Sequence, residues 1–112
     1  MTFQRRTFAL GRLAPGEMNK TEAAYAAEIE AQKHAGVVLW YAFEGIKLRL
    51  ADRTFYTPDF FLMRASGELE CREVKGFWED DARVKIKVAA AMFPFRFTGI
   101  KKIKGGWAEE EF

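Results

Sequence analysis

The sequence predicts one α/β (α+β) domain, with an αβββαβ core in which helices flank a mixed central sheet. Its 112 residues are enough for a single core, and a composition of 49% hydrophobic and 30% charged residues is typical of a globular chain. Two segments with helical periodicity, at about 20–34 and 79–92, enclose three segments of strand type, and a fourth strand follows. Residues 1–18 are expected to form an N-terminal arm, 19–103 the folded domain and 104–112 a peripheral C-terminal tail.

The first helix has a clear start signal. Asn19 is the predicted N-cap, and Glu22, three residues later, completes a capping box. Glu22 shares one helical face with Tyr25 and Ile29, and Gly36 ends the helix. Glu22 is therefore either a capping glutamate favoured by the helix dipole or an acid that reaches a site on the sheet.

The strand segments follow in order. Residues 37–50 are rich in β-branched and aromatic side chains and predict a strand that bends at Gly45. Residues 54–76 predict a hairpin of two strands around a short turn. Residues 95–103 alternate between apolar and polar types and predict the last strand of the sheet.

The sequence of the second helix predicts one buried face and one charged face. Acidic residues fill its first turn, where the helix dipole favours negative charge, and Pro94 ends it. Its apolar stripe consists of Val84, Val88, Ala91 and Met92. From residue 83 to residue 104 the chain carries seven basic residues and no acid. The basic residues of the helix are candidates for contacts with DNA phosphates, or else form a solvated face: Arg83, Lys85 and Lys87.

The predicted hairpin contains the residues whose side chains could bind a metal or take part in catalysis. Asp59 follows Pro58 on its first strand, and Glu73 and Lys75, spaced i and i+2 on the second, point the same way. If the strands pair, the carboxylates of Asp59 and Glu73 and the Val74 carbonyl form an oxygen donor set that suits Mg²⁺. Lys75 would orient a water or stabilise charge on a phosphate. Charged side chains on the solvent face of a strand would give the same pattern.

These residues resemble a known family. Pro58-Asp59 followed by Glu73-Val74-Lys75, and preceded by Asn19-Lys20-Thr21-Glu22, looks like the PD-(D/E)xK nuclease superfamily, especially small phage-encoded members similar to endonuclease I-type Holliday junction resolvases. The resemblance spans about residues 19–103. It implies cleavage of DNA, including branched DNA, with Mg²⁺ or with Mn²⁺ as a substitute.

The resemblance also assigns roles within a nuclease-like domain. It makes Asp59 and Glu73 the metal ligands, Lys75 the catalytic lysine and Glu22 the acid contributed by the first helix. It allows a homodimer with paired active sites. Two other classes stay open: a catalytically degenerate nucleic-acid-binding domain of the same fold, and a structural or protein-interaction domain.

Some single residues have alternative roles. His34 lies near a helix C-terminus, where a cation is favourable, and Cys71 is expected to be a small buried hydrophobe. Trp78 and Trp107 either pack in the core or stack on bases. One cysteine excludes an intrachain disulfide and cysteine-rich zinc sites. No signal peptide or membrane segment is recognisable, so we expect no membrane partner and a cytoplasmic protein, in the host cell cytoplasm if it is phage-encoded.

Overall fold

The two helices form where the sequence predicts them. In the computed structural model, which describes residues 14 and 16–112, helix α1 is Lys20–His34 and helix α2 is Asp80–Met92. Asn19 accepts a hydrogen bond from the Glu22 N–H, and the Glu22 carboxylate accepts one from the Asn19 N–H, so the predicted capping box is present. Neither helix is long and apolar enough to cross a membrane.

Within the described residues, seven strands accompany the two helices. In chain order they are β1 Val38–Phe43, β2 Leu48–Ala51, β3 Thr54–Tyr56, β4 Phe60–Arg64, β5 Leu69–Lys75, β6 Arg96–Ile103 and β7 Gly106–Glu111. Five of them form a sheet in the order β1-β4-β5-β6-β7, and β2 and β3 form a separate two-stranded hairpin. Among these seven strands only β5 and β6 pair in parallel, since α2 connects them. The predicted α+β class with a mixed sheet is confirmed.

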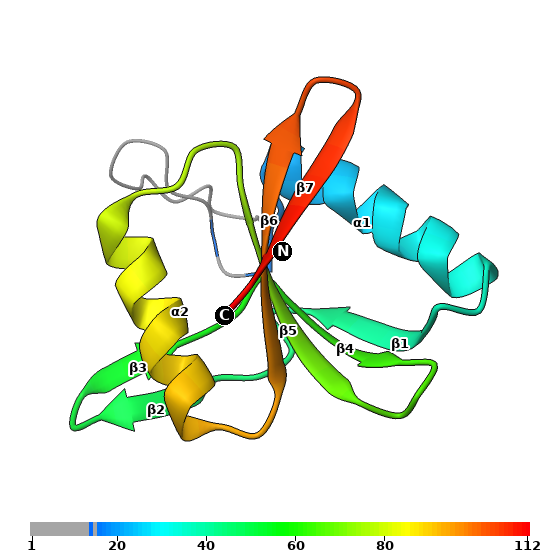
Figure 1. Cartoon of the computed structure of the whole chain (residues 1–112). Coiled ribbons are helices and arrows are strands. Elements are labelled where there is room, and N and C mark those ends of the chain that lie inside the picture. The colour runs from blue at the N-terminus through cyan, green and yellow to red at the C-terminus, as the bar shows by residue number, and fades with distance from the viewer. Residues whose placement is uncertain (1–13, 15) are drawn as a thin grey trace, which may run out of the picture.

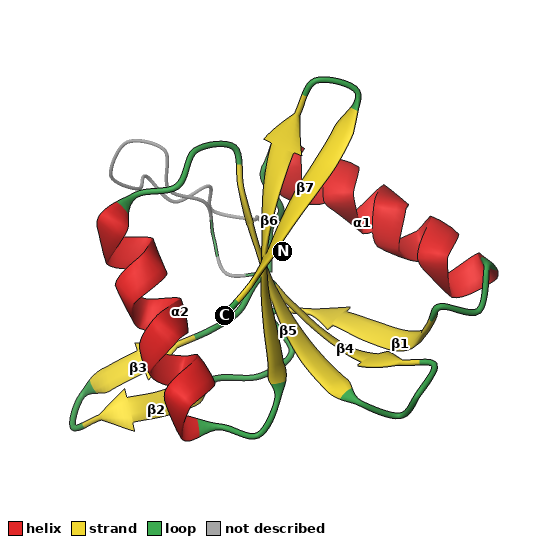
Figure 2. Ribbon diagram, viewed as in Figure 1, coloured by secondary structure: helices red, strands yellow, loops and turns green. Residues whose placement is uncertain are grey.

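Each face of the sheet has its own helix and its own core. Figure 1 shows α1 on one side of the sheet, with α2 and the β2–β3 hairpin on the other. The core under α1 centres on Tyr25, Ile29 and Phe60, and the core under α2 on Phe97 and Ile86. Figure 2 shows that the strands cross between these two layers. Side chains that alternate along β5 therefore face α1 and α2 in turn.

Three predictions about the strands need correction. The expected strand over 37–50 is two strands in different sheets, because the chain leaves the main sheet after β1 to form the hairpin. Likewise the expected first hairpin strand is divided into β3 and β4, and Asp59 precedes β4 instead of lying within a strand. The expected peripheral tail is β7, which pairs along β6 and closes the sheet.

The apolar face of α2 was also predicted wrongly. Val84, Val88 and Met92 are 58%, 39% and 50% exposed, whereas Ile86 and Ala89 are fully buried. The helix is short and rich in alanine, so two apolar stripes compete in its sequence. The stripe through Ile86 and Ala89 faces the sheet and the hairpin.

Candidate active site

The site is built where the chain enters β4, beside the end of β5. Pro58 and Asp59 are both buried, and Asp59 is 8% exposed. The Glu44 N–H donates to the Asp59 carbonyl at 2.8 Å, which attaches this segment to the turn after β1. Antiparallel pairing of β4 with β5 then brings the start of β4 next to the end of β5. Sheet topology therefore joins residues that lie fourteen positions apart.

Asp59 and Glu73 hold each other through the backbone. The Val74 N–H donates to Oδ2 of Asp59 at 2.7 Å, and the Asp59 N–H donates to Oε1 of Glu73 at 3.2 Å. The Tyr56 hydroxyl donates to the same Glu73 oxygen at 2.9 Å. Two buried carboxylates are thus fixed side by side, as the sequence predicted for a paired hairpin. Val74 itself packs its side chain in the core under α1, so only its backbone is available as a ligand.

Lys75 and Glu22 complete the cluster. Nζ of Lys75 lies 3.4 Å from Oε2 of Glu73, and its side chain is 37% exposed. Glu22 uses Oε1 in the capping box, and its carboxylate is close enough to contribute to the pKa of Asp59. Glu22 therefore caps α1, as one interpretation predicted, and its carboxylate adjoins the paired carboxylates.

The cluster contains more acidic groups than basic ones. Burial, and next the charge of Glu73, raise the pKa of Asp59 to about 9, with Glu22 adding to the rise against the Val74 hydrogen bond. Burial also raises the pKa of Glu73, against the opposing charge of Lys75. Burial lowers the pKa of Lys75, but the Glu73, Asp59 and Glu22 carboxylates outweigh it and raise this pKa overall. Three acids thus share one lysine.

The donor chemistry fits a hard divalent cation. Carboxylate and carbonyl oxygens are the ligands that Mg²⁺ accepts, and a cation at this position would offset the crowded negative charge. Within residues 14 and 16–112, no three acidic, histidine or cysteine side chains already stand in the arrangement of a metal-binding cluster. The hydrogen bonds from Val74 and Tyr56 engage one oxygen of each central carboxylate. The second oxygens are Oδ1 of Asp59 and Oε2 of Glu73; these would bind a metal, with Nζ of Lys75 lying 3.4 Å from Oε2.

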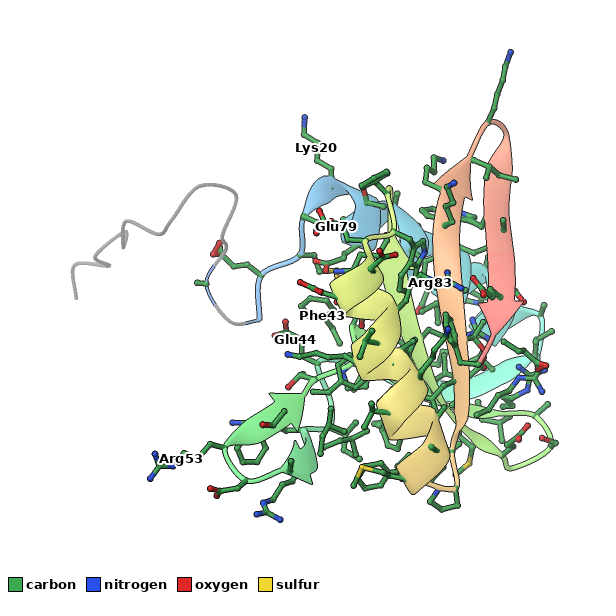
Figure 3. All side chains as sticks on the ribbon, turned by 60° about the vertical axis from the view of Figure 1, so that its left-hand side comes forward. Lys20, Phe43, Glu44, Arg53, Glu79 and Arg83 are labelled. Atoms are coloured by element: carbon green, nitrogen blue, oxygen red, sulfur yellow. The ribbon has the colours of Figure 1, made fainter. Side chains whose placement is uncertain are left out.

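The sequence did not predict two residues that contact the site. Tyr56 is 6% exposed and buries its hydroxyl against Glu73, although its position in a short strand carries no signal of that contact. Glu44 has φ of 51°, in the left-handed region that residues other than glycine seldom adopt. Backbone strain of this kind tends to occur at functional sites. Figure 3 labels Glu44 next to Phe43, on the same side of the molecule as Glu79 at the start of α2.

The basic residues of α2 do not form one surface. Arg83 makes a two-pronged ion pair with Glu110 of β7, with nitrogen–oxygen distances of 2.8 and 2.6 Å. Lys87 lies on the same side, because it contributes with Arg83 to the lowered pKa of Glu110. Lys85 lies on the other side, where its Nζ is 3.4 Å from the Phe55 carbonyl of the hairpin. Figure 3 shows Arg83 between α2 and the β6–β7 pair.

The remaining candidates have structural positions. The His34 side chain is 83% exposed and lies 4.0 Å from Glu30. Cys71 is fully buried, as predicted. Trp107 packs on Tyr25 in the core under α1, and Trp78 lies partly exposed against Gly99 and Phe112. The arm at residues 1–13 and 15, where contacts with DNA or a second subunit were considered, lies outside the described residues.

No protein-family model, curated protein or solved structure matches this chain.

Proposed function

We propose that this protein is a metal-dependent endonuclease of the PD-(D/E)xK type that hydrolyses DNA phosphodiester bonds. One observation carries the proposal: Asp59, just before β4, meets Glu73 and Lys75 of β5 at one edge of a buried cluster, with Glu22 beside them. A protein gains nothing in stability from burying carboxylates that lack enough positive partners. A site for Mg²⁺, or for Mn²⁺ as its substitute, explains why they are held together.

Each residue has a role in this proposal. The bound cation would supply charge for a phosphoryl oxygen and would lower the pKa of the attacking water. Asp59 and Glu73, and the Val74 carbonyl, would hold it, while Glu22 would extend the ligand set from α1. Tyr56 keeps Glu73 in position through its hydroxyl. Lys75 is partly exposed and reaches the cluster from its edge, where it would orient the water or neutralise charge developing on the phosphate.

Contacts with DNA are part of the same proposal. Lys85 and Lys87 are exposed on α2 and are the natural phosphate contacts there. Arg83 would have to exchange its Glu110 partner for a phosphate. The salt dependence of DNA binding tests these roles, because each lost phosphate contact flattens the logarithmic slope by about one unit. A slope unchanged by replacement with alanine would assign a lysine to a solvated face.

The decisive experiment is DNA cleavage by the purified protein. Supercoiled plasmid and a four-way branched DNA are incubated with Mg²⁺, with Mn²⁺ and with EDTA. We expect cleavage with either metal and none in EDTA; cleavage that persists in EDTA would exclude the metal site. The two substrates separate a general nuclease from one that prefers branched DNA.

A variant links cleavage to the site. Lys75→Ala should lose most of the cleavage rate, by about 100-fold or more, because general acid–base and charge-stabilising groups contribute this much. Its DNA binding should persist. Lys104→Ala, at the exposed turn between β6 and β7, is the matched control and should cleave normally. Equal turnover in the two variants would show that Lys75 has no catalytic role, and binding without cleavage in the unmodified protein would favour a degenerate nucleic-acid-binding domain.

A further inference from the structure

A cleft opens directly beside the site, on the face of the sheet that carries α2. It has a volume of about 320 Å³ and is lined by residues of α2, β6, β7 and the segment before α2. Those that matter here are Trp78, Gly99, Lys101, Ala108 and the ion pair of Arg83 with Glu110. This volume is at the small end of the range for ligand pockets, about 300–1,000 Å³.

Strand register places this cleft next to the catalytic cluster. Along the parallel β5–β6 pair, Glu73 is opposite Gly99 and Lys75 is opposite Lys101. Neighbouring strands lie about 4.8 Å apart, and paired residues point to the same face. A nucleotide bound with its phosphate at Lys75 would therefore have its neighbour at the cleft.

The wall of the cleft is a fixed aromatic ring. A Cβ at Gly99 would lie 2.8 Å from Cζ2 of Trp78 and 2.9 Å from Cε2 of Phe112, so only glycine allows both rings to lie against β6. The two rings are 6.0 Å apart and tilted by 40°. Trp78 is thus held by packing while part of its indole lines the cleft. A rigid aromatic surface loses little entropy when a second ring stacks on it.

The available charge in the cleft is positive. Both carboxylate oxygens of Glu110 already accept hydrogen bonds from Arg83. Glu109 also lines the cleft, but it pairs with Ile100, whose side chain lies in the core under α1, so its carboxylate points to that opposite face. Lys101 makes no salt bridge with any residue in the described part of the chain. Its ammonium is therefore free to neutralise a phosphate.

We propose that this cleft binds one unpaired DNA nucleotide next to the cleaved phosphate, with the base on Trp78 and its phosphate at Lys101. A base within a duplex keeps both faces covered by its neighbours, whereas an unpaired base has a face free to stack. The substrate class is then DNA with an unpaired nucleotide, at a bulge, a branch or an end. This inference rests on the proposed function, since it takes the cleavage site as its neighbour.

The test is equilibrium binding of the full chain in EDTA, so that no cleavage interferes. Three fluorescein-labelled duplexes are compared by anisotropy: fully paired, with one bulged nucleotide, and with the same bulge made abasic. We expect the bulged base to bind at least about 5-fold more tightly than the abasic bulge, the lower limit for stacking one base on an aromatic ring. Equal binding of these two probes would overturn the proposal.

Variants locate the effect. Ala108→Phe places a ring in the cleft from β7 and should abolish the preference for the bulged base. Lys101→Ala should weaken all three probes and reduce the salt slope by about one unit. Lys102→Ala is the matched control, because this next residue of β6 lies over Trp107 on the other face, with its Nζ 4.7 Å from the ring centre. A preference that survives in Ala108→Phe, or a loss equal in both lysine variants, would refute the assignment.

The same samples separate this inference from the proposed function. Metal-dependent cleavage without any preference for the bulged base would leave the nuclease in place and remove the subsite. A preference for the bulged base that depends on the cleft, without any cleavage, would support the nucleotide subsite and refute the nuclease proposal. Circular dichroism of each variant establishes that it is folded before its binding is interpreted.

Discussion

Replacing Asp59 by asparagine should stabilise the metal-free protein above neutral pH. The buried Asp59 carboxyl has a pKa of about 9 in the folded chain because of burial and of the Glu73 and Glu22 charges. In the unfolded chain its pKa is about 3.9. Between these values the folded state holds a proton that the unfolded state has released. Since the folded pKa is raised, unfolding free energy falls as pH increases through this window.

The size of the effect follows from one proton. The slope is at most about 1.4 kcal/mol per pH unit, so the loss from pH 5 to pH 8 is up to about 4 kcal/mol. Asparagine has no such proton, and its side-chain oxygen can still accept the Val74 N–H bond that Asp59 accepts at 2.7 Å. Because Glu73 also titrates in this cluster, we expect the variant to gain about 2–4 kcal/mol at pH 8 and almost nothing near pH 4.

Urea unfolding in EDTA, followed by tryptophan fluorescence between pH 4 and pH 9, measures this difference. Asp52→Asn is the control, because the Asp52 side chain is 88% exposed at the tip of the hairpin. It should leave the pH profile of the wild type unchanged. An Asp59→Asn variant that is no more stable at pH 8, or that keeps the full slope, would refute the crowded-carboxylate description of the site.

Three further outcomes are expected. Mg²⁺ at about 100 times its dissociation constant should stabilise the wild type by about 2.7 kcal/mol and Asp59→Asn far less, as measured by the same unfolding curves; no shift in the wild type would count against the metal site. Gly99→Ala should destabilise the protein by about 1–3 kcal/mol, because its new Cβ would meet Trp78 at 2.8 Å, and an unchanged urea midpoint would show that the ring moves aside freely. Glu70→Gln should cost about 3–5 kcal/mol, because it leaves the buried Arg72 guanidinium without its carboxylate, and a loss below about 1 kcal/mol would contradict a structural role for that pair.

Local signals in the sequence were enough to predict the helices and the grouping of Asp59, Glu73 and Lys75. The capping box at Asn19 and Glu22 and the period-two spacing of Glu73 and Lys75 are properties of neighbouring residues, and both are present as predicted. Spacing along the chain therefore predicted which residues belong together.

Long-range packing was not predictable in the same way. Gly45 indicated a bend, but nothing local shows that the chain leaves the sheet there, or that β7 pairs along β6, because each depends on partners distant in sequence. The sequence did not show which face of α2 is buried, because alanines fit either a buried or an exposed stripe. In the structure, the face with Ile86 packs on the sheet. The Tyr56 contact with Glu73 follows only from the position of the hairpin.

A comparison of Glu70 with the paired acids Asp59 and Glu73 supports a functional role for the pair. Glu70 lies on the same strand as Glu73 and is also buried, at 1% exposure. Burial would raise its pKa, but hydrogen bonds from Arg72 and Thr98 outweigh burial and lower it. Arg64 donates a further bond. Glu70 is thus a charge whose cost the fold itself compensates.

Asp59 and Glu73 lack that compensation, although Glu73 lies on the same strand as Glu70. Their pKa values are raised and Lys75 is the one cation within reach among the described residues. The arginines around Glu70 show that this fold can neutralise a buried glutamate with guanidinium groups. That it leaves two carboxylates crowded instead is expected where a cation from outside the chain completes the charge balance, as the proposed nuclease requires.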